Sequence, residues 1–107
     1  MRAFHMFNTD SAPQLASLPS PRPGPGQVAV RLRACGLNFA DLLMAQGRYQ
    51  DTPDTPFTLG LEAAGVVTAL GEGTAGLSEG QRVAVFCGQG GLAEEGVFDA
   101  DTVLPIP

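Results

Sequence analysis

The sequence contains no lysine and no tryptophan, and its six basic residues are all arginines. These arginines are scattered along an acidic chain of net charge −5. Nucleic-acid binding depends on clustered cations that displace counterions from phosphates, so this composition argues against it. The absence of lysine also excludes Schiff-base chemistry and a phosphate-binding P-loop, both of which need a lysine amine.

Long apolar runs and cysteines are scarce as well. No apolar stretch approaches the ~20 residues that a membrane helix requires, and the first ten residues lack the apolar core of a secretory signal. We therefore expect a cytoplasmic protein that does not enter a membrane. Cys35 and Cys87 lie far apart in apolar surroundings. In that compartment this favours free buried thiols over a disulfide.

Glycine and proline are abundant instead, with 14 and 9 residues, which predicts many turns and a β-rich fold. The clearest strand is predicted over residues 27–36, with one apolar face made of Val28, Val30, Leu32 and Ala34. Proline-rich residues 11–26 are predicted to be irregular. Further short strands are predicted at 2–7, 59–71, 79–86, 92–100 and 102–107, a spacing that suggests a small, partly open barrel.

After residue 36 the apolar period becomes that of a helix. Asn38 is a good N-cap, and Gly47 is expected to end the helix. One helical stripe is expected to pack against the core, and it consists of Phe39, Leu42, Leu43 and Gln46.

Asn38 and Asp41 are three residues apart, so they share the other face of this helix, away from the apolar stripe. Asp41 lies in the first turn, where the helix dipole favours an anion. The spacing leaves two interpretations open. Either the pair only stabilises the start of the helix, or it offers polar atoms to a reaction.

Three ordered blocks, ACGLNFADLLMAQGRY, PFTLGLEAAGVV and LSEGQRVAVF, resemble the N-terminal GroES-like catalytic domain of the medium-chain dehydrogenase/reductase superfamily. The resemblance runs over residues 1–107, and GLNFADLL with GRY indicates the quinone oxidoreductase branch, the zeta-crystallin-like enzymes. It implies a mainly β, GroES-like, partly open barrel with one or two short helices. The superfamily's Rossmann cofactor domain is expected outside these residues, because the glycine-rich segment 88–96 does not open a helix.

Zinc-dependent members of the superfamily carry a cysteine where this sequence has Asn38 and a histidine where it has Leu61. Leucine has no lone pair for a metal and an amide is a poor zinc ligand, so we expect no metal site. Gly60, Glu62 and Gly65 match the family's G-x-E-x-x-G motif. The glycines are expected to serve the backbone, through positive φ or close approach. The role of Glu62 stays open.

The resemblance implies the substrate-side domain of a zinc-independent, NADPH-dependent oxidoreductase that transfers hydride to a quinone or enone. Candidate catalytic residues are Asn38, Asp41 and Tyr49, and candidate cofactor-binding residues are Asn38 and Phe39. Tyr49 either donates a hydrogen bond to the reduced oxygen or is a partly buried aromatic with a wet hydroxyl. The parent protein is expected to be a homodimer or homotetramer, and this fragment alone is expected to be inactive.

Two other functions remain open on the sequence. One is a stand-alone GroES-like module for binding or assembly, of the kind that the co-chaperonin uses, although no long mobile apolar loop is evident. The other is an enoyl-thioester reductase of the same superfamily. The sequence leaves undecided which acceptor is reduced and whether NADPH is preferred over NADH, because the residues that read the 2′-phosphate belong to the cofactor domain.

Overall fold

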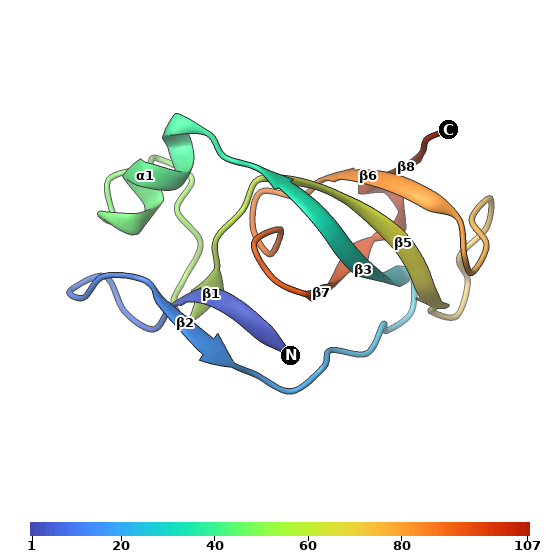
Figure 1. The fold of residues 1–107 in the computed structure, drawn as a ribbon, viewed down its shortest axis with the longest axis horizontal. Helices are drawn as coiled ribbons and strands as arrows, with labels where there is room; N and C mark the ends of the chain where they lie inside the picture. The colour runs from blue at the N-terminus through green and yellow to red at the C-terminus, as the bar shows by residue number, and fades with distance from the viewer.

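The computed structural model describes all residues from 1 to 107, and they form two antiparallel sheets and one α-helix (Figure 1). The three-stranded sheet has the order β2–β1–β4, built from Gln14–Ser17, Arg2–Met6 and Phe57–Thr58. The five-stranded sheet has the order β7–β3–β5–β6–β8, built from Glu95–Asp99, Gln27–Gly36, Glu62–Leu70, Arg82–Phe86 and Val103–Pro105.

Helices contribute little to the fold. The α-helix α1 covers Phe39–Ala45, and a 3₁₀ turn η1 covers Ala100–Thr102. Neither sheet closes on itself, so the prediction of a mainly β, partly open fold with one or two short helices is confirmed. No helix has the length and apolar character needed to cross a bilayer. Figure 1 shows α1 beyond the end of β3, away from the body of the five-stranded sheet.

Apolar side chains gather in two clusters. The first, which we call the sheet core, lies on one face of the five-stranded sheet and contains Val28, Val30, Val67, Val83, Val85, Phe98 and Val103. The second, the helix core, joins α1 to the three-stranded sheet and contains Met6, Met44, Phe57, Leu59 and Leu61. Burial in the helix core is therefore what holds α1 in place, because a helix of 7 residues is not stable by itself.

Residues 92–94 join the two sheets. The N–H of Phe4 in β1 donates to the carbonyl of Leu92, and the N–H of Glu94 donates to the carbonyl of Arg2, both at 2.9 Å. The N–H of Leu32 in β3 donates to the carbonyl of Glu94 at 2.9 Å. This segment therefore fixes β1 against the five-stranded sheet.

The predicted apolar face of β3 is correct for Val28, Val30 and Leu32, although Ala29, predicted on the other face, is buried as well. Val28 and Val30 are buried and Leu32 packs beside them, but Ala34 is exposed. Leu32 pairs with Gly65 and Ala34 with Ala64, so the intervening residue has no partner on β5. Because of this β-bulge, Ala34 lies on the opposite face of the sheet from Leu32, so the prediction that it shares a face with Val28 and Val30 is wrong.

The prediction that residues 11–26 are all irregular is wrong at Gln14–Ser17, which forms strand β2. This strand pairs only with β1, so it is an edge strand. Prolines 13 and 19 flank it without interrupting it. An edge strand tolerates nearby prolines because one side of its backbone needs no partner. The short strand β4 was also not predicted.

Candidate functional site

The start of α1 is built by Asn38 and Asp41. Asn38 has the extended backbone of an N-cap residue, with φ −123 and ψ 158. Its N–H donates to Oδ2 of Asp41 at 2.9 Å, and the N–H of Asp41 donates to the carbonyl of Asn38 at 3.0 Å. A carboxylate at this position stabilises the helix start through both the hydrogen bond and the helix dipole. The predicted N-cap is confirmed.

The end of α1 is also the predicted one. Gly47 has a positive φ of 68, which glycine adopts without steric cost. Its N–H donates to the carbonyl of Met44 at 3.0 Å, and the N–H of Arg48 donates to the carbonyl of Leu43 at 2.8 Å. This is the Schellman arrangement, which satisfies the last carbonyls of a helix.

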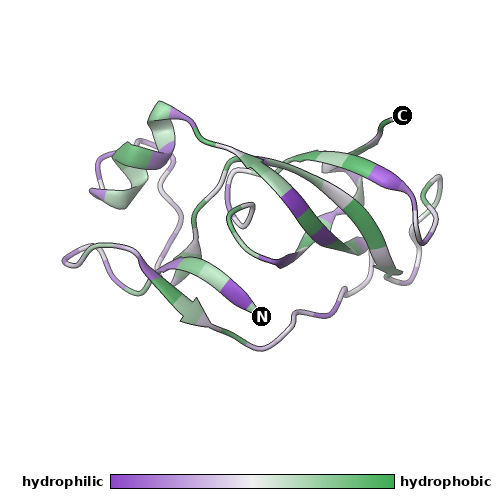
Figure 2. Cartoon of the chain, in the orientation of Figure 1, coloured by the Kyte–Doolittle hydropathy of each residue, from purple (hydrophilic) through white to green (hydrophobic).

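The face that α1 buries is the opposite of the predicted one. Met44 is 1% exposed and Asp41 is buried, whereas Phe39 is 73% exposed and Leu42 is also exposed. The expected packing of the Phe39 stripe is therefore wrong. Hydrophobic residues are spread over α1 (Figure 2), so the apolar pattern alone does not select one face. Contact between Met44 and the helix core selects it.

Two polar atoms at the start of α1 are buried and have no hydrogen-bond partner. They are Nδ2 of Asn38 and Oδ1 of Asp41. Leaving a buried polar group unpaired costs about 1–3 kcal/mol, so such groups are uncommon and need a reason. An amide N–H and a carboxylate oxygen are complementary to a ligand that has both acceptor and donor groups.

Two thiols lie within electrostatic reach of Asp41. Burial raises the pKa of the Cys35 thiol, and the negative charges of Asp41 and Glu62 raise it further. Burial also raises the pKa of Cys87, and the charge of Asp41 adds to this, although backbone hydrogen bonds act in the opposite direction. Both cysteines are free, as predicted, but they are half-buried and not fully buried. Sequence reasoning did not place them near the site.

Cys87 also contacts the residues just before β5, which belong to the G-x-E-x-x-G motif. Its Sγ donates to the carbonyls of Gly60 and Leu61 at 3.4 and 3.3 Å. Together, the end of β3, the start of α1, the start of β5 and the residue after β6 bring the amide, carboxylate and thiol groups into one region.

The other two candidate residues, Phe39 and Tyr49, differ in their burial. The ring of Phe39 directly follows Asn38 and is open to solvent. Tyr49 is half-buried and packs against the helix core. Its hydroxyl makes no hydrogen bond within the chain, so it remains free to donate to a ligand or to water. The structure therefore joins Asn38 to Asp41, and it places Tyr49 beside the same helix without a bond to either.

Residues 24–107 match the family model described as the alcohol dehydrogenase GroES-like domain. The chain belongs to this family. Within this GroES-like domain, Leu61 lies buried in the helix core, where it serves packing. No group of three or more histidine, cysteine, aspartate or glutamate side chains is placed to hold a metal ion.

The motif glycines of this GroES-like domain serve the backbone, as predicted. Gly60 has a positive φ of 112. At Gly65 the carbonyl of Arg31 approaches so closely that a Cβ would collide with it. Glu62 is exposed at the start of β5, so its carboxylate needs no buried hydrogen-bond partner.

Three known proteins illustrate the similarity. The human synaptic vesicle membrane protein VAT-1 homolog is 52% identical over 85 residues, covering 79% of this chain and 20% of that protein. The crystal structure of the human VAT-1 homolog-like protein matches with a TM-score of 0.91 at 34% identity, covering 100% of this chain and 35% of that one. The quinone oxidoreductase from Thermus thermophilus, also solved in complex with NADPH, matches with a TM-score of 0.80 at 36% identity, covering 100% of this chain and 32% of that one. This GroES-like domain therefore spans a fifth to about a third of these relatives.

Proposed function

We propose that these residues form the substrate-side domain of a zinc-independent, NADPH-dependent oxidoreductase that reduces quinones or enones. The observation that carries the proposal is the unpaired, buried Nδ2 of Asn38 at the start of α1. The similarity of the whole chain to a quinone oxidoreductase studied with NADPH supports it.

The residues around Asn38 fit a nicotinamide and an acceptor ring. NADPH, when bound, supplies a hydride to the acceptor. Asn38 offers an amide N–H that has no partner within the chain, and the exposed ring of Phe39 offers an apolar surface for an aromatic ring. We assign the cofactor contact to these two residues.

Asp41 and Tyr49 have different parts in the proposed reaction. Asp41 holds the backbone of Asn38 through its 2.9 Å hydrogen bond, so it acts by positioning that residue. Tyr49 has a free hydroxyl, which would donate a hydrogen bond to the acceptor oxygen as this oxygen gains negative charge. A quinone accepts hydride without a Lewis acid, so the protein's main tasks are to orient the two rings and exclude water.

The proposal concerns a longer protein than residues 1–107. We place this parent protein in the cytoplasm, as a homodimer or homotetramer, and expect the GroES-like domain alone to be inactive. The reason is that no segment of this chain provides the glycine-rich turn at a helix N-terminus that holds a dinucleotide pyrophosphate.

The test uses a chimera in which residues 1–107 replace the corresponding region of the Thermus thermophilus quinone oxidoreductase. NADPH oxidation with 1,4-benzoquinone is measured for the chimera and for Asn38→Ala, Asn38→Ser and Tyr49→Phe. Serine keeps an oxygen for helix capping but removes the amide N–H. If that N–H serves the reaction, both Asn38 variants lose about 1–3 kcal/mol of transition-state stabilisation.

Melting temperatures of the same variants separate catalysis from capping. If Asn38 is only a cap, Asn38→Ala lowers stability by roughly 0.5–2 kcal/mol, Asn38→Ser is close to wild type, and neither changes kcat. That result, with a normal rate for Tyr49→Phe, would mean that the proposed catalytic roles are wrong.

A further inference from the structure

Asp41 carries a buried carboxylate that no basic side chain neutralises. The residue is 7% exposed, Oδ2 accepts from the N–H of Asn38 at 2.9 Å, and Oδ1 has no partner. The ion pair of this chain joins Arg2 to Glu94, and no basic residue lies in the last turn of α1. The dipole of α1 offsets the charge only in part, because a helix presents about half a unit charge at its first turn. The carboxylate therefore favours a ligand that carries positive charge.

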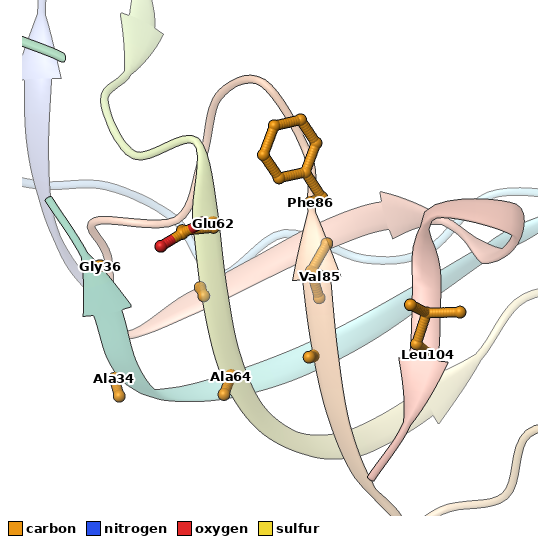
Figure 3. A pocket seen from close by; sticks show the side chains of 9 residues that line it. Ala34, Gly36, Glu62, Ala64, Val85, Phe86 and Leu104 are labelled. Carbon is orange, nitrogen blue, oxygen red and sulfur yellow. The ribbon is translucent and has the colours of Figure 1, made fainter. Parts of the chain in front are cut away.

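A second carboxylate lies at the end of β3. Glu62 pairs with Gly36, and its carboxylate occupies the space that a Cβ on Gly36 would take. Figure 3 shows this carboxylate turned toward Gly36, at a hollow of about 370 Å³ in which Glu62 is the one charged residue. Gly36 is two residues before Asn38. Glu62 and Asp41 therefore contact the two ends of the segment that leads from β3 into α1.

Two thiols respond to the potential that these carboxylates produce. Burial raises the pKa of Cys35, and the charges of Asp41 and Glu62 raise it further. Burial is again the largest cause that raises the pKa of Cys87, and the charge of Asp41 adds to it. Cys35 directly precedes Gly36, and Cys87 follows the end of β6. The negative potential therefore extends over the ends of both strands, beside the proposed cofactor contact.

A negative potential distinguishes the two redox states of a nicotinamide. Asp41 and Glu62 would act on a ring that is neutral in NADPH and carries one positive charge in NADP⁺, because the hydride takes both electrons of its C–H bond to the acceptor. The exposed ring of Phe39 adds a π surface, which also attracts a cation.

We propose that Asp41 and Glu62 favour binding of the oxidised, cationic nicotinamide over the reduced, neutral one, and thereby lower the reduction potential of the bound cofactor. The inference rests on the proposed function, because it uses the cofactor contact assigned to Asn38 and Phe39. It adds a role for the charge of Asp41 beyond its hydrogen bond to Asn38, and it assigns a role to Glu62.

The first test measures dissociation constants of NADP⁺ and NADPH by calorimetry, without acceptor, in the chimera with the Thermus thermophilus enzyme. Asp41→Asn keeps an oxygen that can accept from the Asn38 N–H and removes the charge. It is expected to raise the ratio of the NADP⁺ constant to the NADPH constant by about tenfold, which is about 30 mV for a two-electron couple. Glu62→Gln raises the ratio less, because solvent screens an exposed charge. Glu72→Gln, in an exposed turn beyond the other end of β5, is the matched control and leaves it unchanged.

A second measurement uses the chain alone and needs no cofactor. Asp41→Asn should accelerate the alkylation of Cys35 by iodoacetamide at pH 7.5 in the folded chain, because a negative charge that opposes the thiolate is gone. Asp54→Asn, on an exposed residue of the loop before β4, is the matched control. If Asp41→Asn prevents folding, Glu62→Gln serves for both measurements, because Glu62 is exposed and its charge also acts on Cys35.

The outcomes separate this inference from the proposed function. Equal weakening of NADP⁺ and NADPH binding, or no change in either, would overturn the inference, and the proposed function would stand if the chimera still reduces 1,4-benzoquinone. A raised ratio in a chimera that reduces no quinone would support the inference and count only against the proposed acceptor. Failure of the unmutated chimera to bind either nucleotide would overturn both.

Discussion

At the scale of single residues, Cys35 and Cys87 illustrate how surroundings decide reactivity. Burial is the main cause that raises the pKa of each thiol, and the negative charge of Asp41 acts on both in the same direction. The nucleophile in thiol chemistry is the thiolate, so the raised pKa lowers the reactivity of both cysteines at neutral pH. They therefore contribute neutral thiols to the region around α1 at neutral pH.

This leads to a prediction about pH. The pKa of each folded thiol lies above the usual value of 9.0, so each keeps its proton at pH values where an unfolded cysteine already loses it. Labelling by iodoacetamide at pH 7.5 should be slower in the folded chain than in urea, because less of each folded thiol is thiolate. The contribution of these thiols to the free energy of unfolding is fully present below pH 9.0. It decreases as the pH rises through their raised pKa values.

Single-thiol variants, Cys35→Ser and Cys87→Ser, assign the labelling rates, which mass spectrometry can follow. A folded cysteine that reacts at pH 7.5 as fast as it does in urea would contradict the pKa direction that burial and Asp41 impose.

Asn38 and Asp41 show which features of a residue the sequence predicts. The cap was predictable because it depends on neighbours three residues apart, and the 2.9 Å bond from the Asn38 N–H to Asp41 confirms it. The unpaired atoms were not predictable, because they depend on how α1 lies against the rest of the chain. The same limit applies to Cys35, whose neighbour Glu62 is close only after β3 and β5 pair.

At the scale of elements, α1 shows why a short helix is ambiguous. Leu42, Leu43 and Met44 are consecutive, so apolar side chains point to more than half of the helix circumference. The apolar pattern of α1 is therefore compatible with either face of the helix packing against the core. Met44 packs with Met6 and Phe57 in the helix core, and these partners come from strands that the local pattern of α1 does not contain.

The orientation of α1 gives a prediction for the chain alone. Met44→Ala should cost about 2–5 kcal/mol of unfolding free energy, because it leaves a cavity in the helix core. Leu42→Gln should change it by less than about 0.5 kcal/mol, because Leu42 is exposed. Urea unfolding of both variants measures this. The reverse order of effects would mean that the Phe39 stripe packs after all.

The sequence predicted where the strands lie along the chain better than which face of the sheet each side chain occupies. β3, β5, β6 and β7 lie within the predicted ranges because their alternation and glycine turns are local signals. The exposure of Ala34 follows from the bulge before it, and a bulge depends on pairing with β5. β2 was missed because its prolines dominate the local composition, whereas its pairing with β1 decides its structure.

At the scale of the whole molecule, the fold family was predictable because three ordered sequence blocks carry it, and the match over residues 24–107 confirms it.

The family also gives a prediction about zinc. Leu61 packs in the helix core and no group of three ligands exists, so dialysed protein should contain no stoichiometric zinc by elemental analysis. A chelator should leave the melting temperature unchanged. Tightly held zinc near one equivalent would show that another set of ligands forms.

The last prediction concerns cofactor binding by the chain alone. A dinucleotide needs backbone N–H groups at a helix N-terminus for its pyrophosphate, and α1 cannot provide them because the Asp41 carboxylate already lies in its first turn. The glycine-rich residues 88–91 lead into strand β7 and not into a helix. Calorimetry should therefore detect no NADPH binding to the chain alone tighter than roughly 1 mM, about −4 kcal/mol.

The chimera with the Thermus thermophilus enzyme is the control, and it should bind NADPH more tightly because it retains that enzyme's remaining polypeptide. Micromolar binding by the chain alone would mean that residues 1–107 contain a complete nucleotide site, and the division of labour proposed for this domain would be wrong.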